Sequence, residues 1–307
     1  MKKLIFWCKA VAVLVLVLVF LFAVVSPQYT ENYNASILDK VKRLSSIDGP
    51  KMVLIGNSNL VFGMDSEMLE EAFQMPVVNM GVHGGLGNAF HEQMARINIQ
   101  PGDIYIICHT EYDDDDSIPD PSLAWLTIEN HFPLWRLIRL KDIPSMADAF
   151  STYCKKALAV WAEGESADAD PMYTRESFNV YGDNNYPRPV RDPSIVLPFE
   201  EQALPQIGEQ CVQRLNALNR EIVAKGATML VAAYPIANGE FTPLVSDYAA
   251  FTESLAEALD APVISYFPDY MIQYEYFYDT MYHLTNEGVA IRTNLLIEDI
   301  RFWMESL

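Results

Sequence analysis

Three side chains in the sequence are of the types that acyl-transfer chemistry uses: Ser58, Asp279 and His283. Ser58 follows a short apolar run, Lys51–Ile55, that ends at Gly56. A serine at the end of a buried strand and the start of a helical turn has free backbone N–H groups beside it, which suits a nucleophile. Asp279 precedes His283 by four residues, so on one helical turn the carboxylate could orient the imidazole as a general base. Each motif taken alone also fits a structural role, as a helix cap or as a paired acid and base.

A glycine-rich loop follows the second predicted strand, Val77-Val78. It reads Asn79-Met80-Gly81-Val82-His83-Gly84-Gly85-Leu86-Gly87, and its backbone N–H groups could approach a ligand atom closely. The loop lacks the Gly-Lys-Ser/Thr ending of a nucleotide-binding P-loop, and a flexible turn into the next helix would explain the same glycines. Glu111 and Tyr112 follow the third predicted strand, so we expect them to face the same cleft as His83.

Strands and helices alternate along most of the chain, which predicts an α/β fold with a parallel sheet and right-handed crossovers. Short apolar runs bounded by turn residues indicate buried parallel strands. Open parallel sheets place their functional sites beyond the carboxyl ends of the strands, where the motifs above lie. The predicted strands are 51–55, 77–78, 103–108, 228–234 and 262–265, and the predicted helices of the sheet domain are 65–73, 88–98, 205–225, 243–259 and 286–304.

The stretch from about 113 to 200 breaks this alternation, and we interpret it as an insertion over one edge of the domain. It contains four consecutive aspartates, Asp113–Asp116, then a Trp-rich helical part at 123–140 and a second helical part at 147–161. The aspartates lack the spacing of a calcium-binding EF-hand loop, so we interpret them as a solvated loop. Core packing explains the tryptophans better than stacking on sugar rings does, because they recur at helical spacing.

Composition excludes some classes of function. The chain carries 41 acidic residues against 21 basic ones, a formal net charge of −20. Such a charge repels phosphate backbones, so binding of nucleic acid is excluded as the main function. The four cysteines form no CxxC pair and no zinc-type spacing with histidine, and we expect neither a metal nor a cofactor. One disulfide bridge, between Cys154 and Cys211, stays open as an alternative to free thiols.

The N-terminal segment is apolar enough to cross a membrane. Leu4–Val25 contains one charge, Lys9, and as a helix its 22 residues would span about 33 Å, against a hydrocarbon core of about 30 Å. Lys2 and Lys3 favour a cytoplasmic N-terminus. A cleavable signal peptide is the alternative, although the apolar run exceeds a usual signal core and no small-x-small site follows it. We therefore expect a single-pass protein of the cell membrane, with an anchor at 1–26, a linker at 27–50 and an extracellular domain at 51–307.

The separated motifs resemble the sequence blocks of the SGNH (GDSL-type) hydrolases. The resembling residues are Ile55-Gly56-Asn57-Ser58, Asn79-Met80-Gly81, and Asp279 with His283-Leu284 and Gly288. The resemblance spans 51–307 apart from the insertion, and it implies a flavodoxin-like, three-layer fold around a parallel central sheet. Membrane-anchored relatives of this kind include proteins that handle acyl groups on cell-envelope polymers, such as the teichoic-acid D-alanylation protein and the alginate O-acetylation proteins.

The resemblance also implies roles for the candidate residues. Ser58 would be the nucleophile, His283 the base and Asp279 its orienter. The backbone N–H groups of Ser58 and Gly81 would form the oxyanion hole, with Asn79 as a further donor. Substrate contacts would come from Asn59, His83, Glu111 and Tyr112.

Three departures from the family pattern bear on these roles. Asn57 replaces the usual Asp before the serine, and the acid lies four residues before the histidine instead of three. The third predicted strand is followed by His109-Thr110-Glu111-Tyr112, without the usual Asn. Asn79 or a backbone group would have to replace that donor, whose loss costs about 10²–10³ in rate. Outside the motifs, we expect Arg292 to pair with a carboxylate.

These signals together predict an exported serine O-acyltransferase or acetyl-esterase that acts on a cell-envelope or extracellular glycan. The expected partners are the acylated glycan or acyl donor, the lipid bilayer and a membrane-bound O-acyltransferase. A second hypothesis is a catalytically inactive SGNH-like protein that binds a glycan or an assembly partner, which the missing third-block Asn and the shifted acid favour. A third is an exported anchoring or sensor domain.

Overall fold

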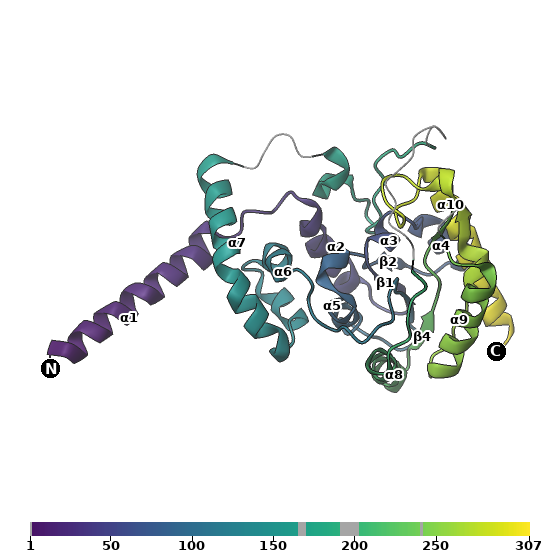
Figure 1. The fold of residues 1–307 in the computed structure, drawn as a ribbon, viewed down its shortest axis with the longest axis horizontal. Coiled ribbons are helices and arrows are strands. Elements are labelled where there is room, and N and C mark those ends of the chain that lie inside the picture. The colour runs from purple at the N-terminus through teal and green to yellow at the C-terminus, as the bar shows by residue number, and fades with distance from the viewer. Residues whose placement is uncertain (1, 165–169, 191–202, 240–241) are drawn as a thin grey trace.

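The computed structural model describes residues 2–164, 170–190, 203–239 and 242–307, and helices surround a parallel β-sheet at its core (Figure 1). The sheet has four strands in the order β2-β1-β3-β4, all paired in parallel. The prediction of an α/β fold with a parallel sheet is therefore confirmed. The strands are β1 (Met52–Gly56), β2 (Val77–Asn79), β3 (Ile104–Cys108) and β4 (Thr228–Val231).

The strands are short apolar runs, and every residue of β1 and β3 is buried, as expected for a parallel sheet that is covered on both faces. The strand predicted at 262–265 is reduced to one bridge, between Val231 and Val263. A second, two-stranded sheet is absent from the predicted elements: β5 (Ile236–Asn238) pairs in parallel with β6 (Met271–Gln273). Each of these strands has only three residues, which is too short for a periodic signal.

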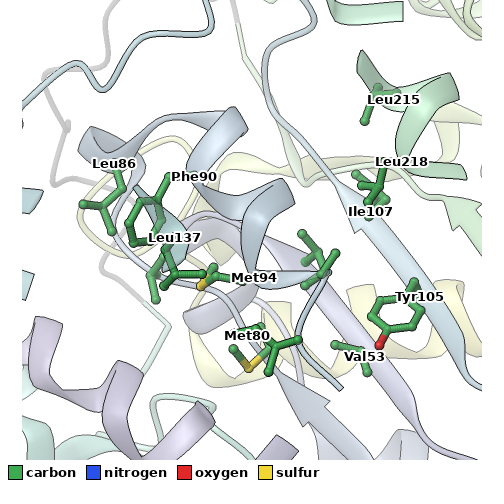
Figure 2. Close-up of a cluster of buried hydrophobic side chains, with 14 of the residues drawn as sticks. Val53, Met80, Leu86, Phe90, Met94, Tyr105, Ile107, Leu137, Leu215 and Leu218 are labelled. Atoms are coloured by element: carbon green, nitrogen blue, oxygen red, sulfur yellow. The ribbon is translucent and has the colours of Figure 1, made fainter. Parts of the chain in front are cut away.

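Helices cover both faces of the sheet. Along β1, Val53 belongs to the larger hydrophobic cluster and Leu54 to the smaller one, because successive side chains of a strand point to opposite faces. Figure 2 shows part of the larger cluster, where Phe90 of α5 and Leu215 of α8 are buried. Helices α4 and α10 close the smaller cluster. The helices around the sheet are α3 (Ser58–Val61), α4 (Ser66–Phe73), α5 (Asn88–Met94), α8 (Glu209–Ala224), α9 (Val245–Ala258) and α10 (Asn286–Glu305).

Most predicted helices begin and end within four residues of the observed bounds. The helix predicted at 123–140 is the exception, because α6 (Pro121–Ile128) ends early and a 3-10 helix, Phe132–Leu137, follows it. The second helix of the insertion is α7 (Ile143–Glu163). Further 3-10 helices lie at Tyr33–Ala35, Gly84–Leu86, Leu140–Asp142, Pro171–Tyr173, Arg175–Ser177, Phe267–Tyr270 and Tyr274–Tyr276.

The chain begins with a long helix that extends away from the body (Figure 1). Helix α1 (Lys2–Phe20) continues into a π-helical turn, Leu21–Val25. Within the span Lys2–Ala23, an 18-residue window has a mean hydropathy of 2.9, and none of that window is buried. This helix is long and apolar enough to span a membrane. The side of the membrane that the body occupies stays a prediction.

The segment between α1 and the sheet packs onto the body. Ile37 of α2 (Ser36–Ser46) is fully buried in the larger cluster. Asp39 pairs with Arg175 of the insertion at 2.6 Å, and Asn32 forms an antiparallel bridge with Thr174. Residues 27–50 and the insertion are therefore joined to each other as well as to the sheet.

Trp125 is the centre of the insertion's own core. Its ring centroid lies 5.1 Å from that of Trp135 and 4.7 Å from that of Phe150, which confirms core packing for Trp125 and places α6 against α7. The same prediction is wrong for Trp161, which is 51% exposed near the end of α7. The cysteines in the structure are all free, so the alternative of a bridge between Cys154 and Cys211 is wrong.

Lys51 and Asp103 form a fully buried ion pair at the start of β1 and β3. Lys51 Nζ lies 2.8 Å from Asp103 Oδ2, and neither side chain is exposed. The Asp103 carboxylate also accepts the backbone N–H groups of Lys51 and Gln100. We expect Lys51→Met to lower the free energy of unfolding by about 3–5 kcal/mol, because it leaves a carboxylate buried without its counter-charge. Urea unfolding of the detergent-solubilised chain measures the loss.

The control combines Lys51→Met with Asp103→Asn. The Asn side chain removes the unpaired charge but keeps an oxygen acceptor for only one of the two N–H groups, because Lys51 and Gln100 bond to different oxygens of Asp103. The double variant should therefore recover part of the lost stability. Equal losses in the single and double variants would contradict this account of the pair.

Candidate active site

Ser58 stands where β1 ends and the chain turns into α3. A Cβ atom on Gly56 would lie 2.6 Å from the carbonyl oxygen of Cys108, so only glycine lets the chain pass β3 this closely. Asn57 is the N-cap of α3, and its Oδ1 accepts the N–H of Asn59. Ser58 is then the first residue of the helix, so its own N–H is not used within the helix.

His283 and Asp279 lie on a tight loop before α10. The sequence spacing had suggested a helical turn instead. The Tyr278 N–H donates to the carbonyl oxygen of His283 at 2.8 Å, which closes the loop. Inside the loop, Thr280 Oγ1 accepts the backbone N–H of His283 at 3.1 Å. Thr280, which occupies the position where the acid was expected, thus shapes the loop that carries the histidine.

The structure brings Ser58, His283 and Asp279 together in one hydrogen-bonded chain. Ser58 Oγ lies 2.9 Å from His283 Nε2, and His283 Nδ1 lies 2.9 Å from Asp279 Oδ1. When Nδ1–H donates to the carboxylate, Nε2 is left as the acceptor for the serine hydroxyl. This is the arrangement in which an imidazole can take a proton from an attacking alcohol.

A tyrosine from the insertion holds the second oxygen of Asp279. The Tyr173 hydroxyl donates to Asp279 Oδ2. Burial alone would raise the pKa of Asp279, but the hydrogen bond and charge of His283, together with the bond from Tyr173, outweigh it and hold that pKa below its ordinary value. An ionised Asp279 can stabilise the imidazolium that forms on His283. No sequence motif marks Tyr173, because only the fold of the insertion brings it within reach of the acid.

An aromatic wall supports the imidazole from the side. The ring centroids of Phe62 and His283 lie 4.1 Å apart, and Tyr33 stacks on Phe62 at 5.9 Å with nearly parallel planes. The carbonyl oxygen of Phe62 accepts the N–H of Leu284. The residues just after the serine are thereby tied to the histidine loop, and the ring of His283 is held in one orientation.

Gly81 and Asn79, the expected oxyanion donors, use their N–H groups elsewhere. The Gly81 N–H donates to Asn79 Oδ1 at 2.9 Å. Asn79 Nδ2 donates to the carbonyl oxygen of Leu60 and to Asp183 Oδ1, and Asn79 has no exposed surface. A Cβ on Gly81 would lie 2.9 Å from Asn79 Oδ1, so this glycine serves a close approach between chain segments. Neither residue supplies a free donor to the cavity beside Ser58.

Ser58, which was also an expected donor, and Gly84, which was not, have backbone N–H groups that fit that role better. Across the described residues, the N–H groups of Ser58 and Gly84 have no hydrogen-bond acceptor. Both residues line a cavity of about 360 Å³ together with His283. Gly84 lies in the predicted glycine-rich loop, but the sequence of that loop does not indicate which of its glycines has a free N–H group. The distinction appears only when the hydrogen bond of Gly81 is known.

The side-chain amide of Asn57 lies between these two groups. Its Nδ2 donates one hydrogen to Thr110 Oγ1 at 2.9 Å, and an amide nitrogen carries two hydrogens. A Cβ on Gly84 would lie 3.8 Å from Asn57 Nδ2, so the amide and the glycine are neighbours. Asn57 thus caps α3 with its oxygen, and its nitrogen keeps a second hydrogen at a residue that lines the cavity.

The cavity beside Ser58 belongs to a larger acidic cleft. Glu111, Asp113 and Asp115 line it, and a second hollow of about 380 Å³ shares Glu111 and Asp113 and extends to Tyr248. Burial, then the charges of Asp113 and Asp115, raises the pKa of Glu111. Among the described residues that line the two hollows there is no Lys or Arg.

The expected substrate contacts divide into two groups. His83 and Glu111 line the cavity with Ser58, and Tyr112, which is 1% exposed, lines the second hollow. Asn59 is fully buried, and its Oδ1 accepts a hydrogen bond from Arg292 at 2.7 Å. Asn59 therefore holds α3 against α10 and does not face the cleft. Arg292 donates to amide and carbonyl oxygens here, so its expected pairing with a carboxylate is wrong.

Comparisons of the chain with family models, with curated proteins and with solved structures find no match. Nor do the described residues contain a group of three or more His, Cys, Asp or Glu side chains that could hold a metal ion.

We expect Tyr173→Phe to slow the covalent labelling of Ser58 by a fluorophosphonate about tenfold, because Asp279 loses the hydrogen bond that holds its carboxylate in position beside His283. Asp279 then becomes a stronger acceptor for the imidazolium, so the acid limb of the labelling rate should move to higher pH. Labelling rates measured across a pH series report both effects.

Tyr186→Phe is the matched control, since Tyr186 packs in the same aromatic cluster without bonding Asp279. If the labelling rate and pH profile of Tyr173→Phe match those of Tyr186→Phe, Tyr173 has no role in the reaction at Ser58.

Proposed function

We propose that this protein is a membrane-anchored serine acyl-transfer enzyme, an O-acyltransferase or acetyl-esterase that acts on an extracellular or cell-envelope glycan. The observation that carries the proposal is the hydrogen-bonded chain from Ser58 through His283 to Asp279, which opens on a cavity with unused N–H donors. Such a chain activates an alcohol towards an ester carbonyl. A three-layer SGNH-type fold is part of the proposal, supported by the covered parallel sheet and by the serine that follows β1.

In the first half-reaction, Ser58 Oγ attacks the carbonyl carbon of an ester while His283 Nε2 takes the hydroxyl proton. Asp279 stabilises the imidazolium that results. When the tetrahedral intermediate collapses, the ester C–O bond breaks, His283 gives the proton to the leaving alcohol, and the acyl group stays on Ser58. A glycan hydroxyl or a water then attacks the acyl-serine with His283 again as the base. The first acceptor gives transfer and the second gives hydrolysis.

Three donors are available for the oxyanion that forms on the carbonyl oxygen. They are the backbone N–H groups of Ser58 and Gly84 and the remaining N–H of the Asn57 amide. In the family that the sequence resembles, the third donor is an Asn after the third strand, and this chain has none there. Asn57, oriented by Thr110, supplies that donor in the proposed mechanism.

The charge of the cleft favours one class of substrate. A donor that carries phosphate or carboxylate groups would be repelled by Glu111, Asp113 and Asp115. Thr110 and Tyr282, which line both hollows, add neutral polar groups of the kind that bind sugar hydroxyls. We therefore favour an ester of a neutral or amine-bearing glycan over an ester of an acidic one.

A fluorophosphonate probe should label the full-length chain at Ser58, which mass spectrometry of the labelled peptide would identify. Ser58→Ala should abolish labelling, and His283→Ala should slow it by about 10²–10⁴, the usual contribution of a general base. Ser117→Ala is the matched control, because Ser117 lines the same cavity and should be dispensable. If the folded chain is not labelled, the enzyme proposal is wrong, and the alternative is a catalytically inactive protein that binds a glycan or an assembly partner.

Asn57→Asp separates the two functions of the Asn57 side chain. The Asp oxygen can still cap α3, but the amide donor is lost and a negative charge stands beside the developing oxyanion. We expect labelling of Ser58 to slow by about 10²–10³, as for the loss of one oxyanion-hole donor, with little change in the thermal unfolding temperature. A labelling rate within a few-fold of wild type would mean that the oxyanion is held by the backbone donors alone.

A further inference from the structure

The insertion meets α1 at the point where the apolar span ends. Phe20 contacts the ring of Trp161 and Phe22 contacts the ring of Phe132, at centroid distances of 6.2 and 5.9 Å. Both phenylalanines belong to the last turns of the span Lys2–Ala23. Trp161 and Phe132 therefore lie at the depth where a helix that crosses a membrane reaches the boundary between lipid and water.

These contacts leave most of the apolar surface uncovered. Phe132 is 73% exposed and Trp161 is 51% exposed, and Leu158, one turn before Trp161 on α7, is 42% exposed. Single exposed apolar residues are ordinary on soluble surfaces. Aromatic side chains gathered around the end of a spanning helix are instead typical of the interfacial belt of membrane proteins.

This region is less acidic than the rest of the chain. Between residues 130 and 162 the sequence has five basic and two acidic residues, with Glu129 and Glu163 on either side, although the chain has a net charge of −20. Arg139 pairs with Asp142 at 2.7 Å, and both Arg139 and Lys141 pair with Asp116. Lys155 and Lys156 are exposed on α7. Lysines beside aromatic side chains suit the phosphates of lipid headgroups.

The junction between α1 and the insertion is well connected. Tyr153 of α7 hydrogen-bonds Ser26, the first residue after the π-helical turn, and also donates to Glu129 Oε1 at 2.8 Å. The same carboxylate accepts the N–H of Gln28 at 2.8 Å. Figure 1 shows α7 crossing the end of α1 and not continuing along it. A spanning α1 would therefore bring α7 down alongside the membrane surface.

We propose that the body rests on the membrane through this surface of the insertion, which consists of Phe132, Leu158 and Trp161 with Lys155 and Lys156. This surface contacts the lipid headgroups, because it packs against the end of α1. In any bilayer that α1 spans, that end lies at the level of the headgroups. The inference rests on the anchor in the proposed function but not on the chemistry at Ser58. It adds a second membrane contact, which fixes the orientation of the body above the bilayer.

Spin labels on the full chain in nanodiscs of phosphatidylcholine and phosphatidylglycerol test the proposal. Cys8→Ala removes the one exposed cysteine of the structure, whose other cysteines are buried. On that background, a label on Leu158→Cys should collide several-fold more often with lipid-soluble oxygen, relative to a water-soluble nickel chelate, than a label on Val223→Cys. Val223 is the matched control, since it is an apolar helical residue of α8 with 56% exposure.

A third label, on Leu16→Cys, reports on the anchor itself. Lipid exposure at both 16 and 158 supports the proposal. Lipid exposure at 16 with water exposure at 158 overturns it and leaves the anchor intact, as expected if a protein partner covers the surface instead of lipid. Water exposure at both positions overturns the proposal and the anchor together. The reactivity of Ser58 is measured separately, by fluorophosphonate labelling.

Discussion

The hydrogen bond between Ser58 Oγ and His283 Nε2 joins side chains that are 225 positions apart, and most of the site constrains its two ends. On the serine side, Gly56 passes so close to β3 that no side chain fits. On the histidine side, Tyr278 and Thr280 fix a loop that α10 then anchors to the sheet. The two atoms of such a bond have to be positioned to well under 1 Å. The residues that carry them must therefore be attached to rigid elements.

Segments outside the sheet complete the site. Tyr33 comes from the stretch before β1 and Tyr173 from the insertion, and both rings pack on Phe62, which itself packs on His283. The insertion thus contributes to the acid–base pair through Tyr173 at one end and contacts the spanning helix through Trp161 at the other.

The sequence was informative where a local pattern determines the outcome. Short apolar runs bounded by turn residues predicted the strands of the main sheet, and the position of Ser58 followed from the strand before it. The partnership of Asp279 with His283 could also be inferred, although a loop and not a helical turn creates it. Contacts such as the bond from Tyr173 could not, because they arise between segments distant in sequence. The choice between Gly81 and Gly84 was equally hidden, since it depends on which N–H already has an acceptor.

Two departures from the SGNH pattern make physical sense as a pair. An Asp at position 57 could cap α3 as Asn57 does, but it would offer no donor to the cavity, and its charge would oppose a developing oxyanion. The missing Asn after β3 would then leave only backbone donors. With Asn57 in place, the hydroxyl of Thr110 accepts one amide hydrogen, and the amide keeps a second hydrogen at a residue that lines the cavity. In the proposed mechanism the two departures compensate each other, because the third oxyanion donor moves from the end of β3 to the residue before Ser58.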